Sequence, residues 1–347
     1  MPIIKIASFN IEWMNDWFTP DAQAADFLPS FTKDGHTNDT DTTARRAARL
    51  IREIDPDILA VQEGPSREEE MALFINRYLS NDAGPIYNFF LSDSGRSQKP
   101  ALLYKSRSVD SIALAPSSDI QMLINEWLVD RDGDEHLEPY QFTRLPLVLN
   151  ASVGGGNLQI IVLHTKSYFV NQGQALWENP ATRQDYIHAA LENRRRNSAE
   201  AMRVRQYVDT ILKNDPQSNI LVAGDLNDGP GMDYFEELYL THNMVDILVG
   251  SAFEPELIFN HAQHDVPAAE RFTAVFDDFV TGENNKKIFL DHVLLSPSFM
   301  RNGNDLTKID GSGTIHHTEY ENLTDNNGSF REDRPSDHRP VSVQLQY

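Results

Sequence analysis

The chain has 347 residues, of which 40% are hydrophobic, contains no cysteine, and has a formal net charge of −22 at pH 7. The lack of cysteine excludes disulfides, zinc–thiolate sites and a cysteine nucleophile. Its apolar runs are far shorter than the roughly 20 residues that span a bilayer, and no signal-peptide pattern follows Met1. We therefore expect a cytoplasmic protein without membrane insertion or an obligate protein partner, although a secreted protein whose leader had been removed would look the same.

Polar residues follow several strand-like apolar runs. In chain order, these runs and the residues that end them are Ile3–Phe9 and Asn10, Asp57–Gln62 and Glu63, Leu158–Leu163 and His164, and Asn219–Gly224 and Asp225. Further on, Asp291 lies within a strand pattern, and Ser336-Asp337-His338 precedes the final strand, Pro340–Leu345. Because strand ends in α/β sheets direct side chains toward one crevice, we expect a carboxylate-rich site with two histidines. This composition indicates a divalent metal combined with acid–base hydrolysis.

Segments with helical periodicity alternate with these strands. They are Thr42–Ile54, which Asp41 or Thr42 could cap, Glu68–Leu79 and Asn197–Leu212. A strand–helix–strand order therefore occurs twice, once in each half of the chain. This order predicts an α/β fold with two packed mixed β-sheets flanked by helices, a four-layer α/β sandwich. We expect residues 1–347 to form a single domain.

Three long segments have loop-like composition: Asp16–Asp41, Tyr168–Arg196 and Gly303–Arg334. Long loops inside a compact domain are often functional. The second mixes aromatic residues with the basic run Arg194-Arg195-Arg196, which is typical of a loop that grips a nucleic acid. A surface excursion with its own small core explains the same pattern equally well.

Two other patterns suggest metal sites but lack the required spacing. The segment Asp130–Asp134 is similar to a calcium loop, yet Glu135 stands where an EF-hand has glycine. We interpret this segment as a solvated acidic turn. The pairs His261 and His264, and His316 and His317, have no acidic third ligand at a clear spacing, and we expect all four at the surface.

Taken together, the order and spacing of the polar motifs resemble the endonuclease/exonuclease/phosphatase superfamily. This family has the DNase I-like fold and includes apurinic endonucleases, sphingomyelinases and inositol-polyphosphate 5-phosphatases. The resemblance runs from residue 3 to residue 345. The motifs that carry it are Phe9-Asn10, Gln62-Glu63, His164, Gly224-Asp225-Leu226-Asn227, Leu290-Asp291-His292-Val293-Leu294 and Ser336-Asp337-His338-Arg339-Pro340-Val341.

The resemblance implies a Mg²⁺ site, with Mn²⁺ as a possible substitute. Mg²⁺ takes oxygen ligands and retains several waters, so one or two carboxylates are enough to hold it. Glu63 is implied as the first ligand, with Asp337 and Asn10 supporting it directly or through water. Glu12 matches an acid that some members place near the metal, and an unrelated edge acid is an equally good interpretation.

The resemblance also implies which residues carry out catalysis. His338 and Asp291 form an acid–base dyad, in which the carboxylate fixes the imidazole tautomer. Asp225 positions or activates the attacking water, and Asn227 donates a hydrogen bond to the scissile phosphate. His164 corresponds to a second histidine that supports the phosphate or the leaving group in DNase I-like and sphingomyelinase members.

Two further matches concern substrate binding. Arg144 lies in an Arg-x-Pro pattern whose arginine can reach a backbone phosphate, and Lys166 lies in the His-x-Lys-Ser pattern of bacterial nuclease-like members. Together with the acidic net charge, they predict a Mg²⁺-dependent endonuclease that binds DNA weakly. Two alternatives remain open: a phosphoesterase acting on a lipid headgroup or inositol phosphate, and a catalytically inactive binding module on the same fold.

Overall fold

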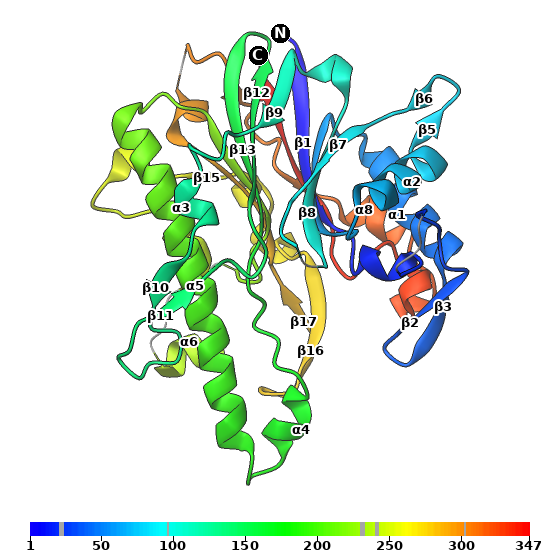
Figure 1. Cartoon of the computed structure of the whole chain (residues 1–347), viewed down its shortest axis with the longest axis vertical. Coiled ribbons are helices and arrows are strands. Elements are labelled where there is room, and N and C mark those ends of the chain that lie inside the picture. Colours follow the sequence, from blue (N-terminus) through cyan, green and yellow to red (C-terminus); the bar gives the residue numbers. More distant parts are fainter. Residues whose placement is uncertain (21–23, 96, 230–232, 240–242, 302) are drawn as a thin grey trace.

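Two β-sheets packed face to face form the centre of the molecule, and helices cover the outer face of each (Figure 1). The computed structural model describes residues 1–20, 24–95, 97–229, 233–239, 243–301 and 303–347. The predicted α/β fold with two mixed sheets flanked by helices is confirmed.

The first sheet combines the N-terminal strands with the C-terminal strand. Its order is β19-β21-β1-β4-β8-β7, with β20 also pairing with β21. β1 runs parallel to β4 and antiparallel to β21, so the two ends of the chain lie side by side. The strands are β1 (Ile3–Asn10), β4 (Ile58–Gly64), β7 (Asn88–Leu91), β8 (Lys99–Tyr104), β19 (Thr307–Lys308), β20 (Thr314–Ile315) and β21 (Val341–Gln346).

The second sheet comes mainly from the middle of the chain, and its order is β15-β18-β14-β13-β12-β9. β13 and β14 are parallel, and β18 runs antiparallel to β14 with Asp225 opposite Asp291. The strands are β9 (Ser111–Leu114), β12 (Leu147–Val153), β13 (Gly156–His164), β14 (Ile220–Asp225), β15 (Asn260–His261) and β18 (Asp291–Leu295).

Within the described ranges, four small hairpins lie outside the two sheets. They pair β2 (Ser30–Lys33) with β3 (His36–Asp39), β5 (Ser80–Asn81) with β6 (Gly84–Pro85), β10 (Trp127–Val129) with β11 (Glu138–Tyr140), and β16 (Ala274–Asp278) with β17 (Glu283–Ile288). The predicted loop 16–41 thus contains the β2–β3 hairpin, although its residues 21–23 lie outside the described part of the chain. The predicted loop 303–334 contains β19 and β20 of the first sheet and the short helix at His317–Glu321.

Helices form the two outer layers. α1 and α2 pack on the first sheet, with α8 beside α1, whereas α5 and α7 cover the second sheet. The helices are α1 (Thr40–Ile54), α2 (Glu68–Tyr78), α3 (Gln121–Ile124), α4 (Gly173–Glu178), α5 (Arg183–Asn214), α6 (Tyr234–Tyr239), α7 (Met244–Val249) and α8 (His317–Glu321). Over the described ranges, none of them has both the length and the apolar composition that crossing a bilayer requires.

Central strands bury both of their faces. In β1, Ile4 and Ile6 pack between the sheets, whereas Ala7 and Phe9 pack against the helical layer. Side chains alternate between the two faces of a strand, so burial on both sides requires an almost continuous apolar run. This is why the sequence marks these strands as uninterrupted hydrophobic segments and why a polar residue at their ends stands out.

Two helices begin earlier than the sequence predicted. α1 starts at Thr40 rather than Thr42, because the Asp39 carboxylate accepts a hydrogen bond from the Thr42 amide at 2.7 Å and caps the helix. α5 starts at Arg183 rather than Asn197, so the prediction that 168–196 is a loop was wrong.

The additional turns of α5 have a simple physical origin. Residues 183–214 contain neither glycine nor proline, so nothing in this segment interrupts a helix. The first turns project below the two sheets together with α4 (Figure 1) and pack on a small aromatic cluster around Tyr186 and Phe235. The apolar residues of these turns, Tyr186, Ile187 and Ala190, pack in this cluster rather than on a sheet.

We predict that the inter-sheet core dominates stability. Ile4 is fully buried between the sheets, whereas its neighbour Ile3 is 52% exposed. Ile4→Ala should lower the free energy of unfolding by about 2–5 kcal/mol, the usual cost of a buried cavity. Ile3→Ala serves as the matched control and should cost less than about 1 kcal/mol. Urea unfolding measures both, and equal losses would contradict this assignment of the core.

Candidate active site

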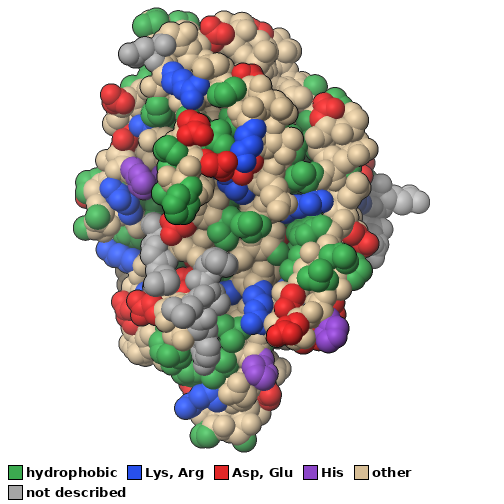
Figure 2. All heavy atoms as spheres, turned by 90° about the vertical axis from the view of Figure 1, so that its left-hand side faces the viewer, with side chains coloured by type: hydrophobic (Ala, Val, Ile, Leu, Met, Phe, Trp, Pro, Cys, Tyr) green, Lys and Arg blue, Asp and Glu red, His purple; other side chains and the backbone are tan. Residues whose placement is uncertain are grey.

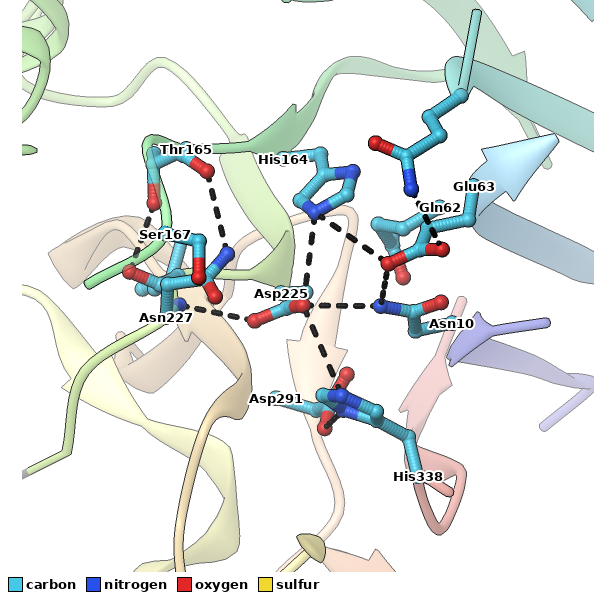
Figure 3. A network of polar contacts seen from close by, with 12 residues as sticks. Asn10, Gln62, Glu63, His164, Thr165, Ser167, Asp225, Asn227, Asp291 and His338 are labelled. Atoms are coloured by element: carbon cyan, nitrogen blue, oxygen red, sulfur yellow. Dashed lines mark hydrogen bonds and ion pairs between the residues drawn. The ribbon is translucent and has the colours of Figure 1, made fainter. Parts of the chain in front are cut away.

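Four polar side chains lie on the strand faces that look into the space between the two sheets, at the end of the apolar residues of those faces. His164 in β13 and Asp225 in β14 come two residues after a core residue, and Asp291 in the antiparallel β18 comes two before one. Asn10 in β1 comes four residues after the core residue Ile6, on the same face of the strand. The alternation of the strands therefore directs all four toward the same end of the space between the sheets. Figure 3 shows them converging from both sheets.

Asp225 is at the centre of this network (Figure 3). Its Oδ2 accepts a hydrogen bond from Asn10 Nδ2 at 2.9 Å and lies 3.6 Å from His164 Nε2 and 3.9 Å from His338 Nε2. Its Oδ1 accepts from the backbone amide of Asn227 at 2.8 Å. Burial raises the pKa of Asp225 to about 7, against the opposing effect of His338. The carboxyl group can therefore exchange a proton near neutral pH.

His338 and Asp291 form a buried pair, as predicted. His338 Nδ1 and Asp291 Oδ2 are 2.7 Å apart, and the Asp291 amide donates to Thr273 Oγ1 at 3.1 Å. Burial alone would lower the pKa of His338, but Asp291, Asp225 and Asp337 more than offset it and raise the pKa well above its usual value. With Nδ1 bound to Asp291, Nε2 is the atom that faces the site.

A β-bulge directs Glu63 toward the site. The pairing of β4 with β8 shifts register between Val61 and Gly64, and Glu63 has a positive φ of 57°. Its Oε2 accepts hydrogen bonds from the Trp13 amide at 2.7 Å and from Gln98 Nε2 at 2.9 Å. Its Oε1 accepts from Asn10 Nδ2 at 3.2 Å and lies 3.9 Å from His164 Nε2. The sequence predicted that a strand ends at Glu63. The bulge turns the Glu63 side chain toward the site.

The Ser-Asp-His turn is attached to the end of β1. Ser336 Oγ donates to the Asn10 carbonyl at 2.7 Å and accepts from the His338 amide at 3.1 Å. Asp337 Oδ1 then lies 3.8 Å from His338 Nε2. Burial, with the nearby Glu12 carboxylate, raises the pKa of Asp337 to about 6. The turn thus adds another carboxylate to the site.

The Glu12 carboxylate forms ion pairs with two arginine side chains. Its Oε2 lies 3.0 Å from Arg331 Nε, and its Oε1 lies 2.9 Å from Arg334 Nη2. Burial alone would raise the pKa of Glu12, but the two arginines lower it overall. Because both carboxylate oxygens are paired with cations, Glu12 is a poor candidate for the metal ligand that we expected. Its contacts instead attach the segment before Ser336 to the end of β1.

His164 is buried, and its Nε2 faces Asp225 Oδ2 at 3.6 Å. Burial lowers the pKa of His164 well below its usual value, and the positive charge of Arg144 adds to this. The imidazole is therefore neutral at pH 7. Its Nδ1 is buried and has no hydrogen-bond partner among the residues that the structure describes.

The predicted substrate-binding residues lie next to this histidine. The Thr165 carbonyl accepts hydrogen bonds from Asn227 Nδ2 at 3.1 Å and from Arg144 Nη1 at 3.3 Å. Lys166 follows directly, and its Nζ donates to the Ser167 carbonyl at 2.8 Å. The structure therefore brings Arg144, Lys166 and Asn227 together at one edge of the site.

Gln98 was missed by sequence reasoning. Its amide nitrogen donates to Glu63 and its carbonyl oxygen accepts from Arg144 Nη2 at 2.5 Å, so it connects a proposed metal ligand to a proposed phosphate contact. Gln98 precedes β8 and follows a loop, and no sequence pattern identified it.

The donor set is suited to a hard cation. Asp225, Asp291 and His338 present ligand atoms within 4.8 Å of one another, and Glu63 and Asp337 lie at the same site. Asp291 Oδ1 is buried without a hydrogen-bond partner in the described residues. Carboxylates gathered away from water are stabilised by a divalent ion, and oxygen donors favour Mg²⁺ or Mn²⁺ over softer metals.

Other predictions about metal patterns were partly wrong. His261 and His316 are buried rather than exposed, and His261 Nε2 lies 2.7 Å from His292 Nδ1. Asp130–Asp134 is a largely exposed turn, as expected, although the carboxylates of Asp130, Asp132 and Asp134 lie within 4.8 Å of one another. Exposed acidic groups often cluster in this way without an ion.

Comparisons with known proteins agree with this geometry. The model of the Endonuclease/Exonuclease/phosphatase family matches residues 7–338. The catalytic domain of human Nocturnin with bound sulfate is 14% identical with a TM-score of 0.52, covering 99% of this chain and 94% of that one. D. rerio TDP2 complexed with single-strand DNA product is 12% identical with a TM-score of 0.51, covering 100% of both chains. At these identities the structures show a shared fold. No curated protein matches the sequence.

The raised pKa of Asp225 predicts a pH effect on stability. Its folded pKa, about 7, lies above the value of about 3.9 expected in the unfolded chain. The fold therefore favours the protonated form, and this contribution is present below about pH 4 and lost as the pH rises through about 7. With EDTA present, Asp225→Asn should gain stability relative to the wild type across this range. Urea unfolding at several pH values measures the difference, with the exposed Asp310→Asn as control. A difference independent of pH would contradict the prediction.

Proposed function

This chain belongs to the Endonuclease/Exonuclease/phosphatase family, and on that premise we propose that it is a Mg²⁺-dependent endonuclease acting on DNA. Enzymes of this family hydrolyse phosphodiester or phosphate-ester bonds. We further propose that residues 1–347 form one domain, because strands of both sheets contribute side chains to the same core.

The convergence of chain segments on Asp225 is the observation that carries the proposal. Asn10 comes from the first sheet, His164 from the second, and His338 from the C-terminal turn, yet all three lie within 4 Å of Asp225 Oδ2. An inactive binding module has no physical reason to keep buried, mutually repelling carboxylates next to a charged histidine, since such an arrangement lowers stability.

Glu63, Asp337 and Asn10 are the proposed metal ligands, and Mn²⁺ can replace Mg²⁺. A bound divalent ion would polarise the phosphoryl oxygen and lower the pKa of an attacking water. Glu63 is suited to this role because the bulge turns its carboxylate toward Asn10 and His164. Glu12 is left out of the ligand set because Arg331 and Arg334 already neutralise it.

The remaining residues supply proton transfer and phosphate binding. Asp225, with a pKa of about 7, receives the proton of the attacking water at Oδ2. His338 is held protonated by Asp291 and donates from Nε2 to the departing oxygen. Asn227 and the neutral His164 are the proposed hydrogen-bond donors to the scissile phosphate.

DNA is the proposed substrate, and binding is weak. Arg144 and Lys166 provide local positive charge beside His164, and D. rerio TDP2, which has the same fold, was solved with a single-strand DNA product. In contrast, the net charge is −22, and basic, acidic and apolar side chains are interspersed over the face shown in Figure 2. Such a surface attracts nucleic acid poorly at a distance, so affinity depends on contacts inside the site.

We predict that the protein nicks circular plasmid DNA in Mg²⁺ or Mn²⁺ and loses this activity in excess EDTA. Parallel assays on RNA, sphingomyelin, inositol polyphosphates and bis-p-nitrophenyl phosphate separate the nuclease from the other phosphoesterases. Glu63→Gln keeps the side-chain shape but removes the charge, and should abolish metal-dependent cleavage without unfolding the protein. The exposed Glu69→Gln is the matched control. Turnover in EDTA would refute the metal mechanism, and preferential cleavage of a lipid or inositol phosphate would refute the substrate.

The His338–Asp291 pair predicts a non-additive effect of mutation. Removing a positioned acid–base group costs a factor of about 10²–10⁴ in rate, so His338→Ala should lose at least that much. Asp291→Asn should also lose activity, because an amide cannot stabilise the imidazolium. The double variant should be little worse than His338→Ala alone, since the two residues act as one unit. Steady-state kinetics on plasmid or oligonucleotide DNA measures this, and multiplying losses would argue against the pairing.

A further inference from the structure

A left-handed turn shortly after β1 binds two of the proposed metal ligands. Glu12 and Trp13 form this turn, with φ values of 56° and 54°. The Glu12 amide donates a hydrogen bond to Asn10 Oδ1 at 3.0 Å, and the Trp13 amide donates to Glu63 Oε2 at 2.7 Å. Two successive backbone amides thus each orient one ligand side chain.

The backbone of this turn is unfavourable for the residues that form it. In the left-handed region the Cβ atom comes close to the following carbonyl oxygen, so glutamate and tryptophan rarely adopt it. Such conformations persist where the surrounding structure holds them. Glu12 is the buried member of the turn, with an exposed fraction of 1%, whereas Trp13 is 39% exposed. The contacts of Glu12 are therefore the main candidates for holding the turn.

Two arginines from the other end of the chain bind Glu12. Arg331 Nε lies 3.0 Å from Glu12 Oε2, and Arg334 Nη2 donates to Oε1 at 2.9 Å. Arg331 Nη2 also donates to the Ile11 carbonyl at 2.7 Å, which binds the backbone just before the turn. The arginines are themselves anchored, because Arg331 Nη1 donates to the Arg334 carbonyl at 2.9 Å and Arg334 Nη1 donates to the Gly328 carbonyl at 2.8 Å. The turn is therefore fixed from both its side chain and its backbone.

We propose that Arg331 and Arg334 are positioning residues for the metal site, and that they act through Glu12 by holding the left-handed turn. The inference rests on the proposed metal-dependent function and deepens it. Groups that hydrogen-bond to metal ligands fix the orientation of those ligands and strongly affect metal affinity. Here the amides of the turn are such groups, and the ion pairs of Glu12 lie one contact further out.

Charge alone would give the arginines the opposite effect on a bound cation. A guanidinium group near a metal site repels a divalent ion. Removing Arg334 would also leave the Glu12 carboxylate with one cation fewer, and Coulomb attraction would then strengthen metal binding. If Arg334 holds the turn, its removal weakens metal binding, because the ligand oxygens of Asn10 and Glu63 lose their orientation. The two roles therefore predict opposite changes in metal affinity.

The test measures Mn²⁺ binding in the absence of substrate, from the loss of the free-ion EPR signal during a titration. Arg334→Gln is the main variant, because the Arg334 side chain is 21% exposed and its replacement should not prevent folding. The dissociation constant for Mn²⁺ should rise about 10- to 100-fold, the usual cost of removing a group that orients metal ligands. Arg334→Lys keeps the charge but loses the planar fork of the guanidinium, so its dissociation constant should lie between those of Arg334→Gln and the wild type.

Arg205→Gln is the matched control. Arg205 is a buried arginine of α5 that pairs with Asp209, and its loss should leave Mn²⁺ affinity unchanged. Circular dichroism at the temperature of the titration checks that each variant is folded. Unchanged or tighter Mn²⁺ binding in Arg334→Gln would overturn the proposal. If Arg334→Gln did not fold, wild-type affinity in Arg334→Lys would overturn it instead.

The same titration separates this proposal from the proposed function. Because no substrate is present, weaker Mn²⁺ binding in Arg334→Gln supports the positioning role even if the enzyme does not cleave DNA. If the wild type bound no Mn²⁺, the proposed metal-dependent function itself would fail, and the positioning role with it.

Discussion

The hydrogen bond between Asn10 and Asp225 connects the two sheets at the active end of the molecule. These residues are 215 positions apart in the sequence, and their strands belong to different sheets that share no backbone hydrogen bonds. Apolar packing between the sheets, which includes Ile6 and Ala223, brings the strand ends close enough for this bond. The geometry of the whole site therefore depends on how the inter-sheet core is packed, because each functional side chain is aimed by the strand that carries it.

The same packing determines the chemistry. Carboxyl groups at the end of a dry core lose solvation, which is why burial is the main cause of the raised pKa values of Asp225 and Asp337. The pKa of His338 is raised as well, but for a different reason, because the surrounding carboxylates outweigh the effect of its burial. A proton acceptor and a charged donor thus lie 3.9 Å apart near neutral pH. Burial and charge pairing, rather than unusual residue types, make Asp225 a proton acceptor and His338 a proton donor.

Each half of the molecule also has a buried glutamate that organises a loop. In the first half, Glu12 pairs with Arg331 and Arg334 and holds the segment leading to Ser336 against β1. In the second half, Glu200 receives hydrogen bonds from the amides of Thr143 and Lys166. Glu12 acts through arginine side chains and also raises the pKa of Asp337, whereas Glu200 binds backbone amides. Buried polar groups of this kind are tolerated because their hydrogen-bonding capacity is satisfied.

The sequence by itself determined the strands that carry the site and the polar residues that end them, because burial on both faces leaves an uninterrupted apolar run that a residue such as Asp225 visibly terminates. The motif order further implied the pairing of His338 with Asp291. Only the tertiary structure decided the role of Glu12, since its partner Arg334 is 322 residues away and no local pattern links them. It also decided the length of α5, because the first turns of this helix pack on a separate small cluster around Tyr186 and Phe235 rather than on a sheet. The local spacing of apolar residues reflects which face of a helix or strand is buried. An ion pair between residues far apart in the chain has no local sequence pattern.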